Sequence, residues 1–194
     1  MKSKKRFSLS TTHLIMLSFL GVVAVGTLLL WLPISSKSGQ SVAFVDALFT
    51  ATTATCVTGL VTLSTHATWS VFGQVVILLL IQIGGLGLIT IMGTVSMLLH
   101  RKMGLGDRML LRDAFNLNAL SGIAPFVRRV VLGTLALEGA GALLYMTVFI
   151  PAYGWRGIWF SVFTAISAFC NAGIDIIAEN SLCNYVTNPV INLV

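Results

Sequence analysis

Charged side chains are scarce in this sequence. Of its 194 residues, 9% are Asp, Glu, Lys or Arg, whereas a soluble domain averages about 25%. Hydrophobic residues make up 56% of the chain, and its mean hydropathy is +0.94. A soluble globule of this length exposes most of its surface to water, so it could not hide so much apolar material. The composition therefore predicts one integral membrane domain and excludes a disordered chain.

Cysteines and acidic residues are few as well, and both shortages exclude classes of protein. Three cysteines provide no disulfide framework. Only six residues are acidic, and the sequence shows no paired carboxylates, no Ser-His-Asp arrangement and no phosphate-binding loop, so the chain is predicted not to be an enzyme. The net charge of +6 does not indicate nucleic-acid binding, because ten of the twelve basic residues lie in two patches, residues 2–6 and 101–129.

Three long apolar runs lie beside these patches. They cover residues 14–33, 71–99 and 130–151, and about 20 helical residues suffice to cross the hydrocarbon core. Basic residues beside a span favour the cytoplasmic side, so both patches and the N-terminus are predicted to be cytoplasmic. A signal peptide is the alternative for the first run, but its apolar core would be only about 7–15 residues long, and no clear cleavage site follows.

Two further apolar segments, residues 42–54 and 157–168, are too short to span a bilayer. Each is predicted to enter from the outer face and to return, which is tolerated where the backbone lines protein or water. The two segments and the loops after them match without gaps at an offset of 114 residues, with six of twelve columns identical. The identical columns pair Phe49 with Phe163, Thr50 with Thr164, Ala51 with Ala165, Ala54 with Ala168, Cys56 with Cys170, and Gly59 with Gly173. This match indicates an internal duplication.

The predicted fold is an all-α membrane protein built from repeats of span, pore helix, filter loop and span, as in pore-loop cation channels. A half-length helix that points inward turns the negative end of its dipole toward the membrane centre, which favours a cation there. The returning strand can present backbone carbonyls in place of water, and glycine allows the backbone angles that this needs. Asp175 lies just past the second loop and is predicted to be a charge at the pore mouth that raises the local cation concentration.

Three motifs resemble a known family. The sequences TCVTGL at residues 55–60, QIGGLG at 82–87 and SAFCNAG at 167–173 are similar to the membrane subunit of the Ktr/Trk/HKT potassium transporters, and most like the bacterial Ktr branch. The likeness covers essentially the whole chain. It implies four repeats around one pore, in which each pore loop supplies one filter strand with a glycine.

The resemblance also implies which residues would form the filter. Glycine at both filter positions implies potassium, because serine at the first position accompanies sodium preference in plant relatives. The backbone carbonyls nearest K⁺ would be those of Val57, Thr58, Asn171 and Ala172. The two implied filter strands are Thr55, Cys56, Val57, Thr58 and Gly59, and Phe169, Cys170, Asn171, Ala172 and Gly173.

Two filter strands cannot ring an ion that the family surrounds with four, so we expect an N-terminal fragment of a longer subunit. The predicted divisions are a cytoplasmic tail (1–12), a first repeat (13–100, filter 55–60), a cytoplasmic connector (101–125) and a second repeat cut short in its last span (126–194, filter 169–174). The resemblance implies a homodimer in the bacterial cell membrane, a cytosolic nucleotide-binding regulatory ring, sodium as a stimulator and no organic cofactor. The competing classes are a secondary transporter with discontinuous helices and an accessory membrane subunit.

Several single positions carry narrower expectations. Glu138 lies inside an apolar run, where a charge costs roughly 2.5–3.5 kcal/mol, so it is predicted to face the helix bundle and to make a structural hydrogen bond. The glycines at 84, 85 and 87 favour close helix packing over flexibility near a gate. Cys56 and Cys170 are predicted to be small buried side chains behind the filter rather than metal ligands.

The four tryptophans, Trp31, Trp69, Trp155 and Trp159, are predicted to form an aromatic belt at the outer membrane interface. Residues 101–129 could form an amphipathic helix on the cytoplasmic face or a plain connector, and the sequence leaves both open.

Overall fold

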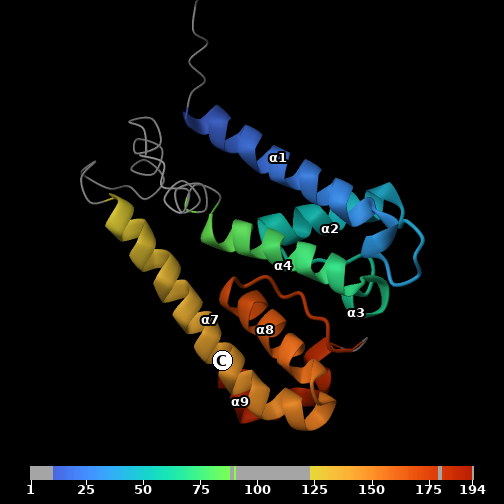
Figure 1. Cartoon of the computed structure of the whole chain (residues 1–194), viewed down its shortest axis with the longest axis vertical. Helices are drawn as coiled ribbons and strands as arrows, with labels where there is room; N and C mark the ends of the chain where they lie inside the picture. The colour runs from blue at the N-terminus through green and yellow to red at the C-terminus, as the bar shows by residue number, and fades with distance from the viewer. Residues whose placement is uncertain (1–10, 88–89, 91–122, 179–180, 194) are drawn as a thin grey trace, which may run out of the picture.

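The structure is a computed structural model that describes residues 11–87, 90, 123–178 and 181–193. The described residues are mostly helical and contain no β-strand. The elements in chain order (Figure 1) are α1 (Thr11–Trp31), η1 (Pro33–Ser35), α2 (Phe44–Cys56), α3 (Thr65–Thr68), α4 (Val71–Leu86), α7 (Ile123–Tyr153), α8 (Arg156–Phe169), η2 (Ser181–Tyr185) and α9 (Pro189–Leu193). The predicted tail (1–12) is described only from residue 11, and the connector (101–125) only from residue 123.

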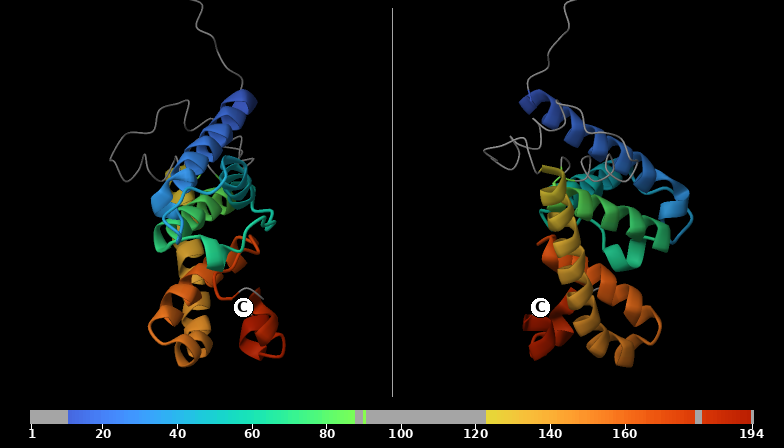
Figure 2. Two further views of the ribbon diagram at one scale, coloured as in Figure 1. Left: turned by 90° about the vertical axis from the view of Figure 1, so that its right-hand side faces the viewer. Right: turned by 60° about the vertical axis from the view of Figure 1, so that its left-hand side comes forward.

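The helices form two groups that meet at α4. In the first, α1, α2 and α4 all pack against one another, and in the second α8 lies along α7 (Figure 1). Helix α4 also contacts α8, and α9 lies against α7 (Figure 2). The helical order of the two groups is the same, because a long helix precedes a short one in each.

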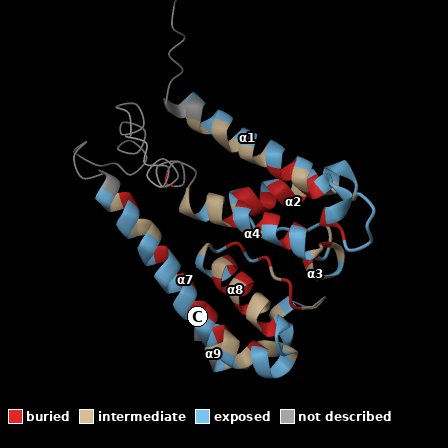
Figure 3. Cartoon of the chain, viewed as in Figure 1, coloured by how far each residue is buried: buried red, intermediate tan, exposed pale blue. Residues whose placement is uncertain are grey.

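The main core runs through both groups. Its fully buried side chains include Leu30, Trp69, Ile77, Phe163 and Ile176, and partly buried residues of α1, α4 and α8 pack against them. Figure 3 shows that the buried positions gather where α2, α4 and α8 face inward, whereas α1 and α7 have long exposed stretches.

The exposed stretches of the two long helices are apolar. Leu17 and Leu20 in α1 are 59% and 70% exposed, and Leu137 and Leu143 in α7 are 62% and 66% exposed. A soluble protein rarely exposes so much continuous apolar surface, whereas lipid tails are as apolar as leucine.

The helices at the three predicted spans differ in length. Among the described residues, Pro125–Tyr153 is the one helix long and apolar enough to cross a membrane by itself, and the apolar helices Ile15–Trp31 and Val71–Leu86 are shorter. Helix α4 ends where Gly87 takes a φ of 79°. The rest of the predicted run 71–99, apart from Thr90, lies outside the described residues, as does most of the region 101–129.

The aromatic-belt prediction is wrong for Trp69. Trp31 and Trp155 are exposed, but Trp69 is fully buried and Trp159 is half-buried. The Trp159 indole N–H donates to Gln74 Oε1 on α4 at 2.8 Å. A buried indole usually has such an acceptor, and this one ties α8 to the first group of helices.

Gly157 sets how closely α8 approaches the end of α7. A Cβ atom added at this position would collide with the backbone carbonyl of Phe149. Because backbone atoms cannot yield as side-chain ends do, we expect Gly157→Ala to lower the free energy of unfolding by about 1–3 kcal/mol. Thermal unfolding in detergent measures the change. The matched control is Gly133→Ala in α7, where an added Cβ meets nothing within 4 Å; equal losses in both variants would contradict the prediction.

Candidate functional site

The first loop leaves α2 through a left-handed turn. Helix α2 ends at Cys56, and Val57 takes a φ of 55°. The N–H of Thr58 donates to the carbonyl of Thr53 at 3.0 Å, which closes the turn as in a Schellman motif. A β-branched residue seldom adopts this conformation, and the strain costs about 1–3 kcal/mol. Gly59 follows with a φ of 75°.

The second loop has the same backbone geometry 114 residues later. Asn171 takes a φ of 57°, and Gly173 takes a φ of 65°. The N–H of Ala172 donates to the carbonyl of Ser167 at 2.7 Å, the counterpart of the bond that closes the first turn. The sequence match thus extends to hydrogen bonds and to the sign of φ.

A buried hydroxyl holds the residue after each glycine. Thr53 Oγ1 accepts the N–H of Leu60 at 3.0 Å, and Ser167 Oγ accepts the N–H of Ile174 at 3.1 Å. The two hydroxyl residues occupy the same column of the duplicated segment and are 3% and 2% exposed. The sequence comparison did not single out Thr53 and Ser167, because Thr and Ser are not identical residues. The hydroxyl group that both side chains carry was the signal that could have identified them.

The two loops touch each other at their glycines. A Cβ added to Gly59 would lie 2.6 Å from the carbonyl oxygen of Ala172, and one added to Gly173 would lie 3.8 Å from Gly59 Cα. The residues around them differ in exposure, since Ala172 is buried whereas Thr58 is exposed. The structure therefore brings the two predicted filter strands together at these glycines.

The glycines of α4 pack against both loops. A Cβ at Gly84 would collide with the backbone carbonyl of Thr55, and one at Gly85 would collide with the side chain of Cys170. Of the two interpretations of this glycine run, close packing is what the structure shows at these two positions.

Cysteine burial differs from the prediction. Cys170 is half-buried against Gly85, but Cys56 is exposed. The prediction that both thiols are buried is wrong for Cys56, whose side chain lies on the exposed side of the last turn of α2. Within the described residues, no group of three His, Cys, Asp or Glu side chains could hold a metal ion.

Glu138 has the buried hydrogen bond that its position in an apolar run demands. The residue is 5% exposed, and its two carboxylate oxygens accept from Gln82 Nε2 at 2.9 and 3.1 Å. Gln82 lies on α4, two residues before Gly84. The bond therefore joins α7 to α4 close to the point where α4 supports the loops.

These observations define a helical chain in which α2 and α8 each end in a left-handed turn followed by a loop glycine of positive φ. Comparison with protein families shows that the chain belongs to the TrkH family of cation transport proteins, which it matches over residues 2–194. The resemblance to the Ktr/Trk potassium transporters is thereby confirmed, and the family is one of membrane transporters rather than of enzymes.

Individual relatives agree with this family assignment. The chain is 42% identical over 185 residues to the potassium/sodium uptake protein NtpJ of Enterococcus hirae, covering 95% of this chain and 41% of that protein. It is 42% identical over 179 residues to the Ktr system potassium uptake protein B of Bacillus subtilis and 33% identical over 181 residues to that of Vibrio alginolyticus. These matches cover 92% and 93% of this chain, and 40% and 39% of the relatives. The chain thus spans about two-fifths of the length of these bacterial uptake proteins.

The hydroxyl of Thr53 is predicted to protect the N–H of Leu60 from solvent. Replacing Thr53 with Val removes the acceptor, and because one hydrogen bond contributes about 1 kcal/mol, amide exchange in residues 57–61 should accelerate about fivefold. Hydrogen exchange read by mass spectrometry measures this rate. Thr52→Val is the control, since the Thr52 hydroxyl donates to Leu48 within its own helix; exchange that is equally fast in both variants would disprove the anchor.

The bond between Gln82 and Glu138 gives a second prediction. Glu138→Gln keeps an acceptor oxygen for the Gln82 amide, so the thermal midpoint in detergent should stay close to that of the unchanged chain. Glu138→Leu leaves a buried donor without a partner and should lower the free energy of unfolding by about 1–3 kcal/mol. If the Leu variant were as stable as the Gln variant, the bond would have no structural role.

Proposed function

We propose that this chain is the N-terminal part of a Ktr-type potassium uptake subunit, in which K⁺ crosses the cell membrane through a filter of backbone carbonyls. The observation that carries the proposal is the pair of loops: equivalent positions have the same left-handed turn, the same closing hydrogen bond and a glycine of positive φ, and the two glycines meet. The relatives named for potassium uptake support the choice of ion.

The helices before the loops supply favourable electrostatics. Each loop follows directly on the C-terminal end of a short helix, α2 or α8, and the partial negative charge of that end attracts a cation. The carbonyls of Val57 and Thr58 in one strand, and of Asn171 and Ala172 in the other, would replace the water shell of K⁺. No side-chain ligand is needed for this mechanism.

The remaining parts of the proposal follow the resemblance. Two further filter strands would come from the rest of a longer polypeptide, in keeping with relatives more than twice as long. The divisions 13–100 and 126–194 would be its first two repeats, with the N-terminus in the cytoplasm. Relatives that are named components of a Ktr system support assembly with other subunits, which we propose to be a second copy and a cytosolic nucleotide-binding ring, with sodium as a stimulator.

A secondary transporter with discontinuous helices is the second candidate. Such folds bind substrate near the membrane midplane, where half-helix ends converge, and they usually carry inverted repeats. Both loops follow a span that is predicted to run outward, so both are predicted to enter from the same side, which disfavours inverted repeats. If the chain were an accessory membrane subunit, the duplicated loops would have no function that explains them.

Growth of a bacterium that lacks its own potassium uptake tests the filter. The complete subunit should restore growth at low K⁺, and this chain alone should not. Gly59→Ser adds a side chain where φ is 75° and the Ala172 carbonyl is in the way. We expect its ratio of K⁺ to Na⁺ uptake to fall about tenfold, equivalent to about 1.4 kcal/mol.

Gly21→Ser provides the control, because an added Cβ meets nothing within 4 Å there. Expression of each variant in the membrane is checked by immunoblot. A complete subunit that fails to take up K⁺, or a Gly59→Ser subunit that is well expressed and keeps its K⁺ preference, would rule out the filter at 55–60.

A further inference from the structure

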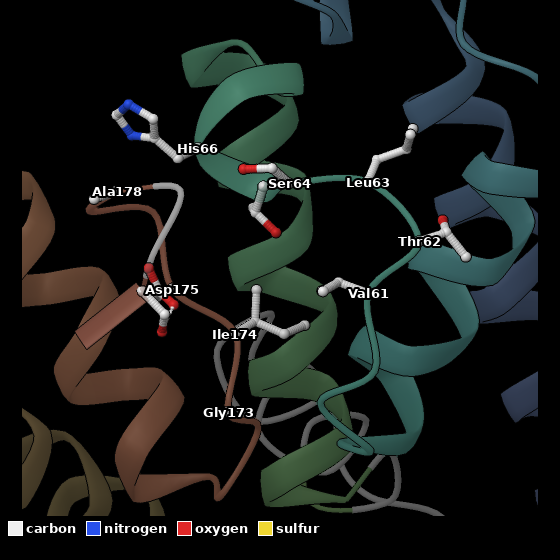
Figure 4. A pocket seen from close by; sticks show the side chains of 11 residues that line it. Val61, Thr62, Leu63, Ser64, His66, Gly173, Ile174, Asp175 and Ala178 are labelled. Atoms are coloured by element: carbon white, nitrogen blue, oxygen red, sulfur yellow. Dashed lines mark hydrogen bonds between the residues drawn. The ribbon is translucent and has the colours of Figure 1, made fainter. Parts of the chain in front are cut away.

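A pocket of about 320 Å³ lies between the two segments that follow the loop glycines (Figure 4). Residues 61–66 form one wall, and residues 173–175 and 178 form the other, together with Ser181. Because Gly173 itself belongs to the lining, the pocket opens directly beside the second candidate filter strand.

Hydrogen bonds hold both walls in place. The ring of His66 reaches across to the second segment, where Nδ1 bonds to the carbonyl oxygen of Ile176 at 2.7 Å. Asp175 accepts the N–H of Ile177 at 3.2 Å and the hydroxyl of Ser181. Ser64 accepts the N–H of Ala67 at 3.4 Å and so begins α3. A preformed cavity loses little conformational entropy when it binds a ligand.

Most of the polar side chains that line the pocket carry oxygen, with His66 as the exception. Among the described residues around the pocket, Asp175 alone bears a formal charge, and the residues with hydroxyl groups are Thr62, Ser64, Thr65 and Ser181. A carboxylate has about four acceptor sites, and the two bonds above leave room for more. The nearby cation of Lys37 donates to the carbonyl oxygen of His66 and does not line the pocket. Such a set of ligands suits a hard cation.

The volume indicates how that cation would be bound. A volume of about 320 Å³ is far more than a bare alkali ion requires. It therefore fits an ion that keeps most of its hydration shell and contacts the protein through water and one carboxylate.

The acidic residue is not part of the duplicated pattern. The residue 114 positions before Asp175 is Val61, which lines the same pocket from the opposite wall (Figure 4). Only one of the two repeats carries the charge, so this pocket has a single acidic residue, on the wall that follows the second loop.

We propose that this pocket binds a hydrated alkali-metal cation before the ion loses its water in the filter. The site is more than a diffuse surface charge, because it has walls, a carboxylate held by two hydrogen bonds and room for a hydrated ion. The proposal rests on the potassium-uptake function proposed above for the order of events, but binding in the pocket can be measured without transport.

Uptake kinetics of the complete subunit test the role in transport. A single carboxylate a few ångströms from an ion is worth about 1 kcal/mol in water, so Asp175→Asn should raise the K⁺ concentration for half-maximal ⁸⁶Rb⁺ uptake about fivefold and leave the maximal rate unchanged. Asp46→Asn, in the first turn of α2 and outside this pocket, should change it less than twofold. Equal effects in both variants would overturn the proposal.

Uptake measured at high ionic strength distinguishes a binding site from a diffuse surface charge. At 0.5 M choline chloride the interaction of exposed charges is largely screened, and choline is too large to replace a small hydrated ion. The difference between Asp175→Asn and the unchanged subunit should persist there. Its disappearance would show that Asp175 only concentrates cations at the surface, and the pocket would then not be a binding site.

Direct observation distinguishes failure of the pocket from failure of the filter. Crystals of the complete subunit grown with Tl⁺ should show anomalous density in the pocket, and Asp175→Asn should remove that density while density beside Gly59 remains. A missing peak in the unchanged protein, or a peak that survives the substitution, would overturn the pocket. A pocket peak without density beside the loop glycines would instead contradict the filter.

Discussion

The contact of α4 with both loops depends on two positions that have no side chain. Gly84 lies against the last turn of α2 and the Val57 side chain at the start of the first loop, and Gly85 lies against Cys170 of the second. One helix thus supports both loops, although they lie 114 residues apart in the chain. A rigid helix that contacts two loops at once fixes their separation, and the meeting of Gly59 with Gly173 follows from that arrangement.

Buried polar side chains keep α4 in register with the second group of helices. Gln74 accepts from Trp159 on α8, and Gln82 donates to Glu138 on α7. These bonds lie two turns apart on α4, on either side of its apolar core residues. Apolar packing alone tolerates small sliding of one helix along another, whereas a buried hydrogen bond is lost when the register shifts.

The first loop is held in a strained conformation by its surroundings. Val57 holds a left-handed conformation at the end of α2 even though its side chain is β-branched. Such strain persists only where the surroundings enforce it, and it concentrates at functional sites. Here the enforcing contacts are the hydroxyl of Thr53 and the packing of Gly84.

The outward faces of α1 and α7 carry leucines that suit lipid or further helices.

The sequence by itself determined the class of protein, the duplicated segment and the two loop glycines. Composition excludes a soluble fold because apolar surface must be buried, and the repeat is visible because the identical columns fall at one constant offset. The short helices were also placed to within about two residues at each end, as is usual for such boundaries.

Only the tertiary structure decided which residues meet. The partner of Glu138 could not be predicted, because nothing in the sequence places Gln82 opposite it. Trp69 and Trp159 turned inward, since Gly73 and Gln74 offered space and an acceptor that residue type alone does not indicate. The pocket beside Gly173 likewise exists only because the segments after the two glycines converge, and that convergence is fixed by long-range packing around α4.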